Sequence, residues 1–431
     1  MSPIVVLTLL TASLPAIVAV AVWMWRRPIR FLAAYFAVLP VGSAVSLPLG
    51  LPSSFSTVSS LLGLLVIAVY FRRWKRERPP LRIPSLSVPV WAIYLALAAA
   101  STAWSIRSSA TINGLLVLIS LIGLFFVVVV TPITSQELGY LRAWIATGAA
   151  LTGLYGIVLA ATGNLQKTGA GLARFMVTGA GGGDRGDPNI TAAAFLVPIS
   201  IALWEGLNPD RSRKSRGWYL TAAALAGSAV LLTASRGGLL SLGVVSVVTI
   251  LSRKRGILSL VLLGLMVLPT MLLIPSTFQE RADNTGTSGR TEIWRLAIDS
   301  CPQYCPTGSG YGTFADVHEA AILVSEDATG TKLRYQAHSI WLEALIELGV
   351  LGFALLIVAF AITMNDLIHV NIAERGGALA GLIGLLVANT FLSTLTFKYF
   401  WLGLIYALLV VGSAADKTSI SPLHPAGHSA R

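Results

Sequence analysis

The sequence predicts an all-α, polytopic transmembrane helical bundle of twelve or thirteen spans. Hydrophobic residues make up 55% of the 431-residue chain and charged residues only 12%, about half the roughly 25% typical of soluble domains. Apolar runs of about twenty residues, the length that crosses a bilayer, recur along the chain. A helix also satisfies its own backbone hydrogen bonds, as lipid requires. We therefore expect residues 1–431 to form a single integral membrane domain.

Each predicted span is an apolar run between segments rich in charge, proline or glycine. The first run lacks a small-residue cleavage site and ends in Trp23-Met24-Trp25-Arg26-Arg27, so we interpret it as a span and not as a cleavable signal. Thirteen spans place the N-terminus outside, and twelve spans with both ends inside are the alternative. In order, the spans are residues 3–25, 31–51, 57–71, 88–103, 111–131, 141–162, 189–207, 218–235, 237–252, 257–275, 339–363, 376–396 and 397–413.

Basic clusters define the orientation of the predicted spans. The net charge is +12, and its clusters fall on one side of the span order, at Arg26/Arg27/Arg30, Arg72–Arg82, Arg211–Arg216 and Arg253-Lys254-Arg255. The positive-inside rule makes that side cytoplasmic. Contact with anionic membrane lipids accounts for the charge without nucleic acid as a partner. The loops 163–188 and 276–337 then face outward, which is the periplasm of a Gram-negative cell.

The large loop 276–337 contains both cysteines, Cys301 and Cys305. An oxidising compartment permits a short disulfide between them, and the sequence leaves its formation open. Two neighbouring thiols are too few for a structural metal site, so we expect no metal here.

An arginine lies at the outer membrane boundary in the turn Thr233-Ala234-Ser235-Arg236-Gly237-Gly238. Such an arginine is costly unless it snorkels, pairs or meets an anion. The planar fork of Arg236 suits phosphate oxygens. Binding of a phosphate and simple snorkelling at the turn are the two interpretations.

A second arginine, Arg290, precedes a short helix that the spacing of Ile293, Leu296 and Ala297 predicts. At a helix N-terminus, backbone amides and a guanidinium can share one anion. The glycine run at 308–312 allows the backbone to approach a ligand closely, with an ordinary turn as the alternative.

A histidine, His338, directly precedes an apolar helix that contains Glu343 and Glu347. An imidazole titrates near neutral pH and can accept a proton as a general base. A capping or interface role is the alternative. His318 lies in the same loop but in no motif, and we assign it no role.

Together, these pieces resemble the O-antigen ligase and polymerase superfamily of membrane glycosyltransferases over roughly residues 180–410. The family often has asparagine after the histidine, whereas this chain has Ser339, which puts in doubt an amide beside the base. The matching motifs are Gly186-Asp187-Pro188-Asn189, Ser235-Arg236-Gly237, Gly289-Arg290 with Trp294, Gly308-Ser309-Gly310-Tyr311-Gly312-Thr313-Phe314, and His338 with Glu347, Gly349 and Gly352.

The resemblance implies a GT-C-type architecture and a glycan donor on undecaprenyl diphosphate. It also implies metal-independent transfer without a cofactor, on the periplasmic side of the inner membrane. By residue, Arg236 and Arg290 would bind the diphosphate and His338 would act on the acceptor. Secondary candidates are Asn189, Arg174, Arg185 and Arg334, and we interpret the last three mainly as solvated loop charges.

Several functions remain open at the level of sequence. The chain is most similar to an O-antigen ligase, which joins the lipid-linked polysaccharide to lipid A–core with inversion. An O-antigen polymerase and a protein O-oligosaccharyltransferase use the same donor chemistry. A polysaccharide flippase, from a different class, should place charges near the bilayer midplane, whereas the notable charges here lie at the outer boundary.

Overall fold

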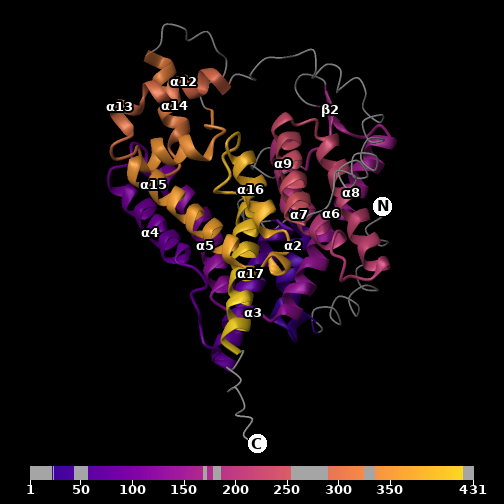
Figure 1. The fold of residues 1–431 in the computed structure, drawn as a ribbon. Coiled ribbons are helices and arrows are strands. Elements are labelled where there is room, and N and C mark those ends of the chain that lie inside the picture. Colours follow the sequence, from indigo (N-terminus) through magenta and orange to yellow (C-terminus); the bar gives the residue numbers. More distant parts are fainter. Residues whose placement is uncertain are drawn as a thin grey trace, which may run out of the picture.

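The computed structural model describes residues 22, 24–42, 57–167, 172–177, 186–253, 290–324 and 335–420. These residues form a bundle of packed helices (Figure 1), which confirms the all-α prediction. The predicted spans 3–25 and 257–275 lie outside the described residues, apart from the end of the first. The total number of spans and the GT-C-type architecture therefore stay predictions.

Every predicted span that falls on described residues overlaps a helix. Among the described residues, five helices are long and apolar enough to cross a membrane, namely α5 (Ser108–Val129), α6 (Ser135–Ala161), α7 (Pro188–Gly206), α15 (Ile340–His369) and α17 (Lys398–Ile420). The helices are α2 (Pro28–Gly42), α3 (Val58–Glu77), α4 (Ser87–Ala100), η1 (Ser101–Ala103), α5 (Ser108–Val129), α6 (Ser135–Ala161), α7 (Pro188–Gly206), α8 (Arg213–Leu232), α9 (Arg236–Ser252), α12 (Arg290–Asp299), α13 (Cys301–Tyr304), α14 (Phe314–Val324), α15 (Ile340–His369), η3 (Ile372–Glu374), α16 (Ala378–Asn389) and α17 (Lys398–Ile420). Two short antiparallel strands, β1 (Gln166–Lys167) and β2 (Ala173–Arg174), are the strands of the described chain.

The predicted span 376–396 is wrong in extent. The run 376–396 forms a helix only over Ala378–Asn389, and the chain then follows an irregular path to α17. The Thr394 hydroxyl donates a hydrogen bond to the Asn389 side-chain oxygen at 2.7 Å, which fixes this path. Irregular backbone at membrane depth is tolerated only where it is buried in protein or lines a cavity.

The bundle has two chemically different ends. We call the end that carries residues 290–324 the loop end and the opposite one the basic end (Figure 1). At the basic end, Arg72 donates to the Trp25 carbonyl at 3.2 Å, and Arg253 lies over the Trp204 ring at 4.0 Å. Described members of the basic clusters thus share one end. Its assignment to the cytoplasm stays a prediction.

Buried ion pairs and hydrogen bonds connect α6, α7 and α17 at the basic end. Glu205 of α7 is 2% exposed and pairs with Arg142 of α6 at 3.0 Å and with Arg211 at 2.9 Å. Arg142 also donates to the Tyr406 hydroxyl of α17 at 2.9 Å. Since removing one member of a buried pair leaves an uncompensated charge, this network holds α6, α7 and α17 in register.

The described part of the large loop packs onto α15. One small buried cluster connects α12 to α15 and to the residue before His338. It includes Ile293, Ala297, Phe314, Val317, Ala337 and Ile346. A disulfide joins Cys301, the first residue of α13, to Cys305, which directly follows this helix, and this answers the question that the sequence left open. Residues 276–289 and 325–334 of this loop lie outside the described residues.

Candidate active site

The turn that carries Arg236 is fixed by hydrogen bonds between α7 and α9. Ser235 caps α9, because its hydroxyl accepts from the Gly238 amide at 3.0 Å. The same hydroxyl donates to the Asn189 side-chain oxygen at 2.7 Å. Asn189 therefore positions the turn, and Arg236, the first residue of α9, is exposed at the loop end. Ala234 has a φ of 47° in this turn, a left-handed conformation that costs a non-glycine residue energy.

Arg290 is the first residue of α12 and is half-buried. Burial lowers the pKa of its guanidinium from the ordinary value, and the negative charge of Asp187 acts in the opposite direction. Asp187 caps α7 by accepting hydrogen bonds from the Asn189 and Ile190 amides at 2.6 and 3.2 Å. The start of α12 therefore lies close enough to the start of α7 for the Asp187 charge to act on Arg290.

Trp294 links this arginine to the histidine segment. It lies one helical turn after Arg290, and its indole N–H donates to the Ala337 carbonyl at 2.9 Å. The indole stacks on Phe391, with ring centroids 6.3 Å apart and planes at 19°. A Cβ on Gly237 would lie 3.7 Å from that phenyl ring. The two aromatic rings thus bring the Arg236 turn, the Arg290 helix and the residue before His338 to one place.

His338 has an unusual backbone. Its φ is 48°, in the left-handed region that histidine adopts more often than most other non-glycine residues. The N-cap residue of α15 is Ser339 and not His338, and an interface role stays the alternative for this histidine. Strained backbone at a chemically active side chain supports a functional hypothesis, and general-base catalysis by His338 stays a prediction.

Arg174 was interpreted from the sequence as a solvated loop charge, and that interpretation is wrong. Its side chain is only 7% exposed, because β2 lies against the bundle. The next residue, Phe175, donates its amide to the Leu232 carbonyl at 2.8 Å, at the end of α8 just before the Arg236 turn. Arg174 is therefore a buried residue, and its place among the secondary site candidates stays a prediction. Arg185 and Arg334 lie outside the described residues.

The glycine run at 308–312 packs closely against α15 of the same chain. The Gly310 amide donates to the Glu347 carbonyl at 2.9 Å, and a Cβ on Gly308, whose φ is 86°, would lie 2.3 Å from that oxygen. The Glu347 carboxylate accepts from the Gly312 and Phe314 amides at 2.8 and 3.0 Å. The run thus docks the loop on α15, and the ligand-contact interpretation is not needed to explain Gly308 and Gly310.

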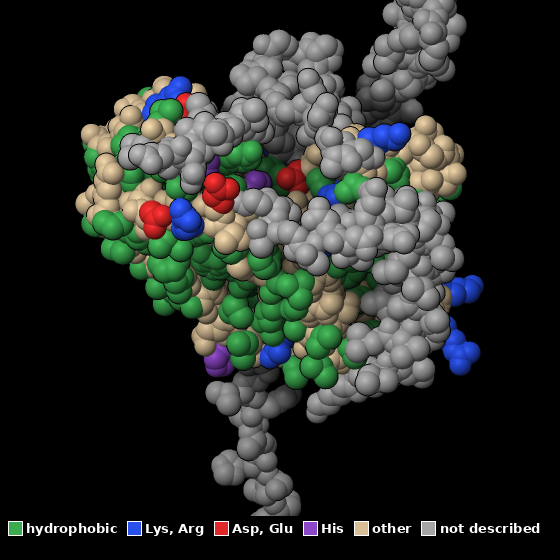
Figure 2. Space-filling view, turned by 90° about the horizontal axis from the view of Figure 1, so that it is seen from above, with side chains coloured by type: hydrophobic (Ala, Val, Ile, Leu, Met, Phe, Trp, Pro, Cys, Tyr) green, Lys and Arg blue, Asp and Glu red, His purple; other side chains and the backbone are tan. Residues whose placement is uncertain are grey.

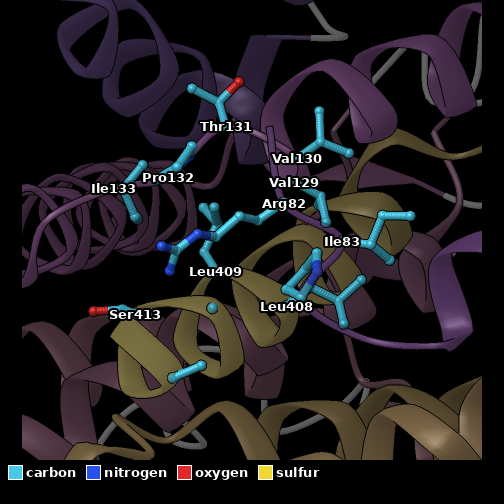
Figure 3. Close-up of a pocket in the computed structure, with 13 residues that line it drawn as sticks. Arg82, Ile83, Val129, Val130, Thr131, Pro132, Ile133, Leu408, Leu409 and Ser413 are labelled. Carbon is cyan, nitrogen blue, oxygen red and sulfur yellow. The ribbon is translucent and has the colours of Figure 1, made fainter. Parts of the chain in front are cut away.

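Two cavities lie at opposite ends of the bundle. Gln336 and Glu343, on either side of His338 in sequence, help to line a cavity of about 320 Å³ at the loop end. Figure 2 shows acidic, basic and histidine side chains exposed together on this end. The second cavity, of about 100 Å³, lies between the end of α5 and α17, with Arg82 at its centre and Ser413 beside it (Figure 3). It contains none of the predicted site residues.

Sequence reasoning missed Phe391 and Ser393. Both belong to the run that was read as a continuous span, and neither residue type signals chemistry. Among the described residues, no group of three or more His, Cys, Asp or Glu side chains is placed to hold a metal ion.

The fold and the site define a polytopic membrane protein with arginines and a histidine gathered at one end of its bundle. Residues 221–357 match the family model described as O-antigen ligase. The match supports the O-antigen ligase superfamily and does not distinguish its members. No curated protein sequence matches the chain significantly. The matched segment contains Arg236, Arg290 and His338, whereas Asn189 and Phe391 lie beyond its ends.

Proposed function

We propose that this protein is an O-antigen ligase that transfers a glycan from undecaprenyl diphosphate to a sugar hydroxyl of lipid A–core at the periplasmic face of the inner membrane. The observation that carries the proposal is the Trp294–Phe391 contact, which gathers the Arg236 turn, Arg290 and His338. The superfamily match supports the same class of chemistry.

The donor needs stabilisation of negative charge. A lipid diphosphate is a good leaving group, and cations placed where its charge develops lower the barrier. Arg236 and Arg290 each offer a fork that can contact two phosphate oxygens. Two arginines supply this charge without a divalent metal, so transfer should continue in EDTA.

The acceptor needs a base. As the acceptor hydroxyl oxygen bonds to the anomeric carbon of the donor, its proton passes to the imidazole of His338. The bond from that carbon to the phosphate oxygen breaks, and its electron pair leaves with the diphosphate. Attack from the side opposite the diphosphate inverts the anomeric centre, and the base contributes about 10²–10⁴-fold.

The test uses purified full-length protein with lipid-linked donor, lipid A–core acceptor and EDTA. His338→Asn removes the base but tolerates the positive φ, so transfer should fall by about 10²–10⁴-fold while the protein stays folded. Arg236→Lys and Arg290→Lys should raise the KM for donor, because the fork is lost. The matched control is Arg295→Lys on the same helix, since Arg295 is 75% exposed and lies 3.8 Å from Asp299. Near-normal transfer by His338→Asn would remove His338 from the mechanism.

The choice of acceptor is tested in the cell. Deleting the gene in its native host should leave bare lipid A–core while long polymer accumulates on undecaprenyl diphosphate. Core that still carries a single repeat would instead identify a polymerase and would contradict the ligase proposal.

A further inference from the structure

The loop-end cavity is lined by four separate parts of the chain. It lies between α5, residues 311–315, the start of α15 and the irregular segment after α16. Its volume of about 320 Å³ falls at the lower end of the roughly 300–1,000 Å³ found for small-molecule sites. Its described lining residues are Ala110, Asn113, Gly114, Val117, Tyr311, Gly312, Phe314, Ala315, Gln336, Glu343, Glu347, Ser393, Leu395 and Thr396.

The lining of this cavity contains one buried hydroxyl, that of Ser393, without a well-placed protein partner among the described residues. Ser393 is only 7% exposed, and its hydroxyl, although beside the Glu343 carboxylate, makes no hydrogen bond of good geometry within the described chain. The amides of Asn113 and Gln336 also line the cavity. A buried hydroxyl without a partner is costly, so an occupant that offers hydroxyl groups would stabilise this arrangement.

The charge of the cavity selects its occupant. Glu343 and Glu347 lie four residues apart on one face of α15, but Glu347 already binds two backbone amides of the glycine run. Glu343 is thus the carboxylate available to an occupant. The described part of the lining contains no lysine or arginine, and its carboxylates favour donors of hydrogen bonds over a phosphate. Carboxylates accept from hydroxyls, and amides both donate and accept, which is the chemistry that recognises a sugar.

The cavity and the arginines proposed to bind the diphosphate are built from different helices. Helices α5 and α15 lie on one side of α16, and α7 and α9 lie on the other (Figure 1). Arg236 begins α9, and the Asp187 charge places Arg290 near the start of α7. The cavity instead adjoins α15, which His338 precedes. An inverting displacement needs the acceptor on the side opposite the leaving group, and a cavity beside α15 with the arginines at the starts of α9 and α12 allows this arrangement.

We propose that this cavity binds the sugar of the acceptor that carries the attacking hydroxyl, and that Glu343 determines its affinity. The proposal rests on the glycosyltransferase function above. Glu343 accepts hydrogen bonds from sugar hydroxyls, and Asn113 and Gln336 orient the ring so that one hydroxyl faces His338.

The test is steady-state kinetics of the purified full-length protein, with each substrate varied at saturating concentration of the other. Glu343→Gln keeps the size of the side chain and removes the charge, and Asn113→Leu removes one amide from an exposed position of α5. Each variant should raise the KM for lipid A–core about tenfold, with kcat within about threefold and an unchanged KM for donor. The control is Asp366→Asn, at the far end of the same helix, which should match the wild type.

The outcomes separate this inference from the function on which it rests. A rise in the KM for donor instead of acceptor would overturn it by assigning the cavity to the donor glycan. An equal loss of kcat with no change in either KM would also overturn it, since that indicates a packing role. If His338→Asn loses transfer while Glu343→Gln behaves as wild type, the proposed function stands and the acceptor cavity is refuted.

Discussion

Replacing Trp294 by phenylalanine tests whether the described contacts assemble the site. The indole N–H of Trp294 donates to the Ala337 carbonyl at 2.9 Å, and the ring stacks on Phe391. Phenylalanine retains an aromatic ring for the stack but has no donor. The change therefore isolates the hydrogen bond that holds α12 against the residue before His338.

The magnitude follows from the burial of the acceptor. Ala337 is fully buried, and a buried carbonyl that loses its donor costs about 1–3 kcal/mol. A loss of about 1–3 kcal/mol corresponds to a factor of about 5–150. If it is felt in the transition state, kcat/KM for transfer falls by that factor. Trp294→Ala also removes the stack, which contributes about 0.5–1.5 kcal/mol beyond burial, so its activity should fall further.

The assay compares kcat/KM of both variants with that of Trp144→Phe, a tryptophan of α6 that is 38% exposed and distant from the site. Hydrogen exchange of residues 290–299 reports the docking of α12 independently. Trp294→Ala with wild-type kcat/KM and unchanged exchange in this segment would refute the reasoning.

Three further changes test the scaffold in detergent by thermal unfolding. Gly349→Ala should lower stability by about 1–2 kcal/mol or more, since φ is 66° and the added Cβ would lie 2.9 Å from a carbonyl oxygen; an unchanged unfolding temperature would contradict this. Glu205→Gln should cost about 3–5 kcal/mol, because it leaves two arginines without their buried carboxylate, and a loss below 1 kcal/mol would show that the arginines reach solvent. Ala234→Gly should raise stability by up to about 1 kcal/mol with kcat unchanged, since φ is 47° and relief of strain exceeds the entropy of glycine. A less stable Ala234→Gly protein would place the strain elsewhere.

Apolar periodicity predicts the spans because lipid imposes both length and helicity, but it does not mark where a helix continues into water. The run 57–71 was expected to end at the first arginines, whereas α3 extends to Glu77. Arg73 and Glu77 pair at 2.9 Å one turn apart, and such i,i+4 pairs stabilise an exposed helical turn. Where a helix ends among charged residues therefore depends on local ion pairs, and a hydrophobicity pattern does not show them.

The sequence predicts only the charged and titratable residues of the candidate site. Arg236, Arg290 and His338 stand out in sequence because charge is costly at a membrane boundary, so their residue types alone suggest function. Phe391 does not stand out, since a phenylalanine in an apolar run reads as lipid-facing helix. Its position depends on the early end of α16 at Asn389 and on the irregular chain that follows.

That irregular chain explains why the site and the acceptor cavity lie together. The segment after Asn389 is covered by protein and also lines a cavity, which keeps backbone without helical hydrogen bonds away from lipid. The phenyl ring of Phe391 contacts Trp294 and lies next to the Arg236 turn. Ser393, two residues further on, lines the loop-end cavity. One break in a transmembrane run thus contributes to the donor side and to the acceptor side of the proposed reaction. A helix continued through these residues would separate the two, so the break is the structural feature on which the proposed function depends most directly.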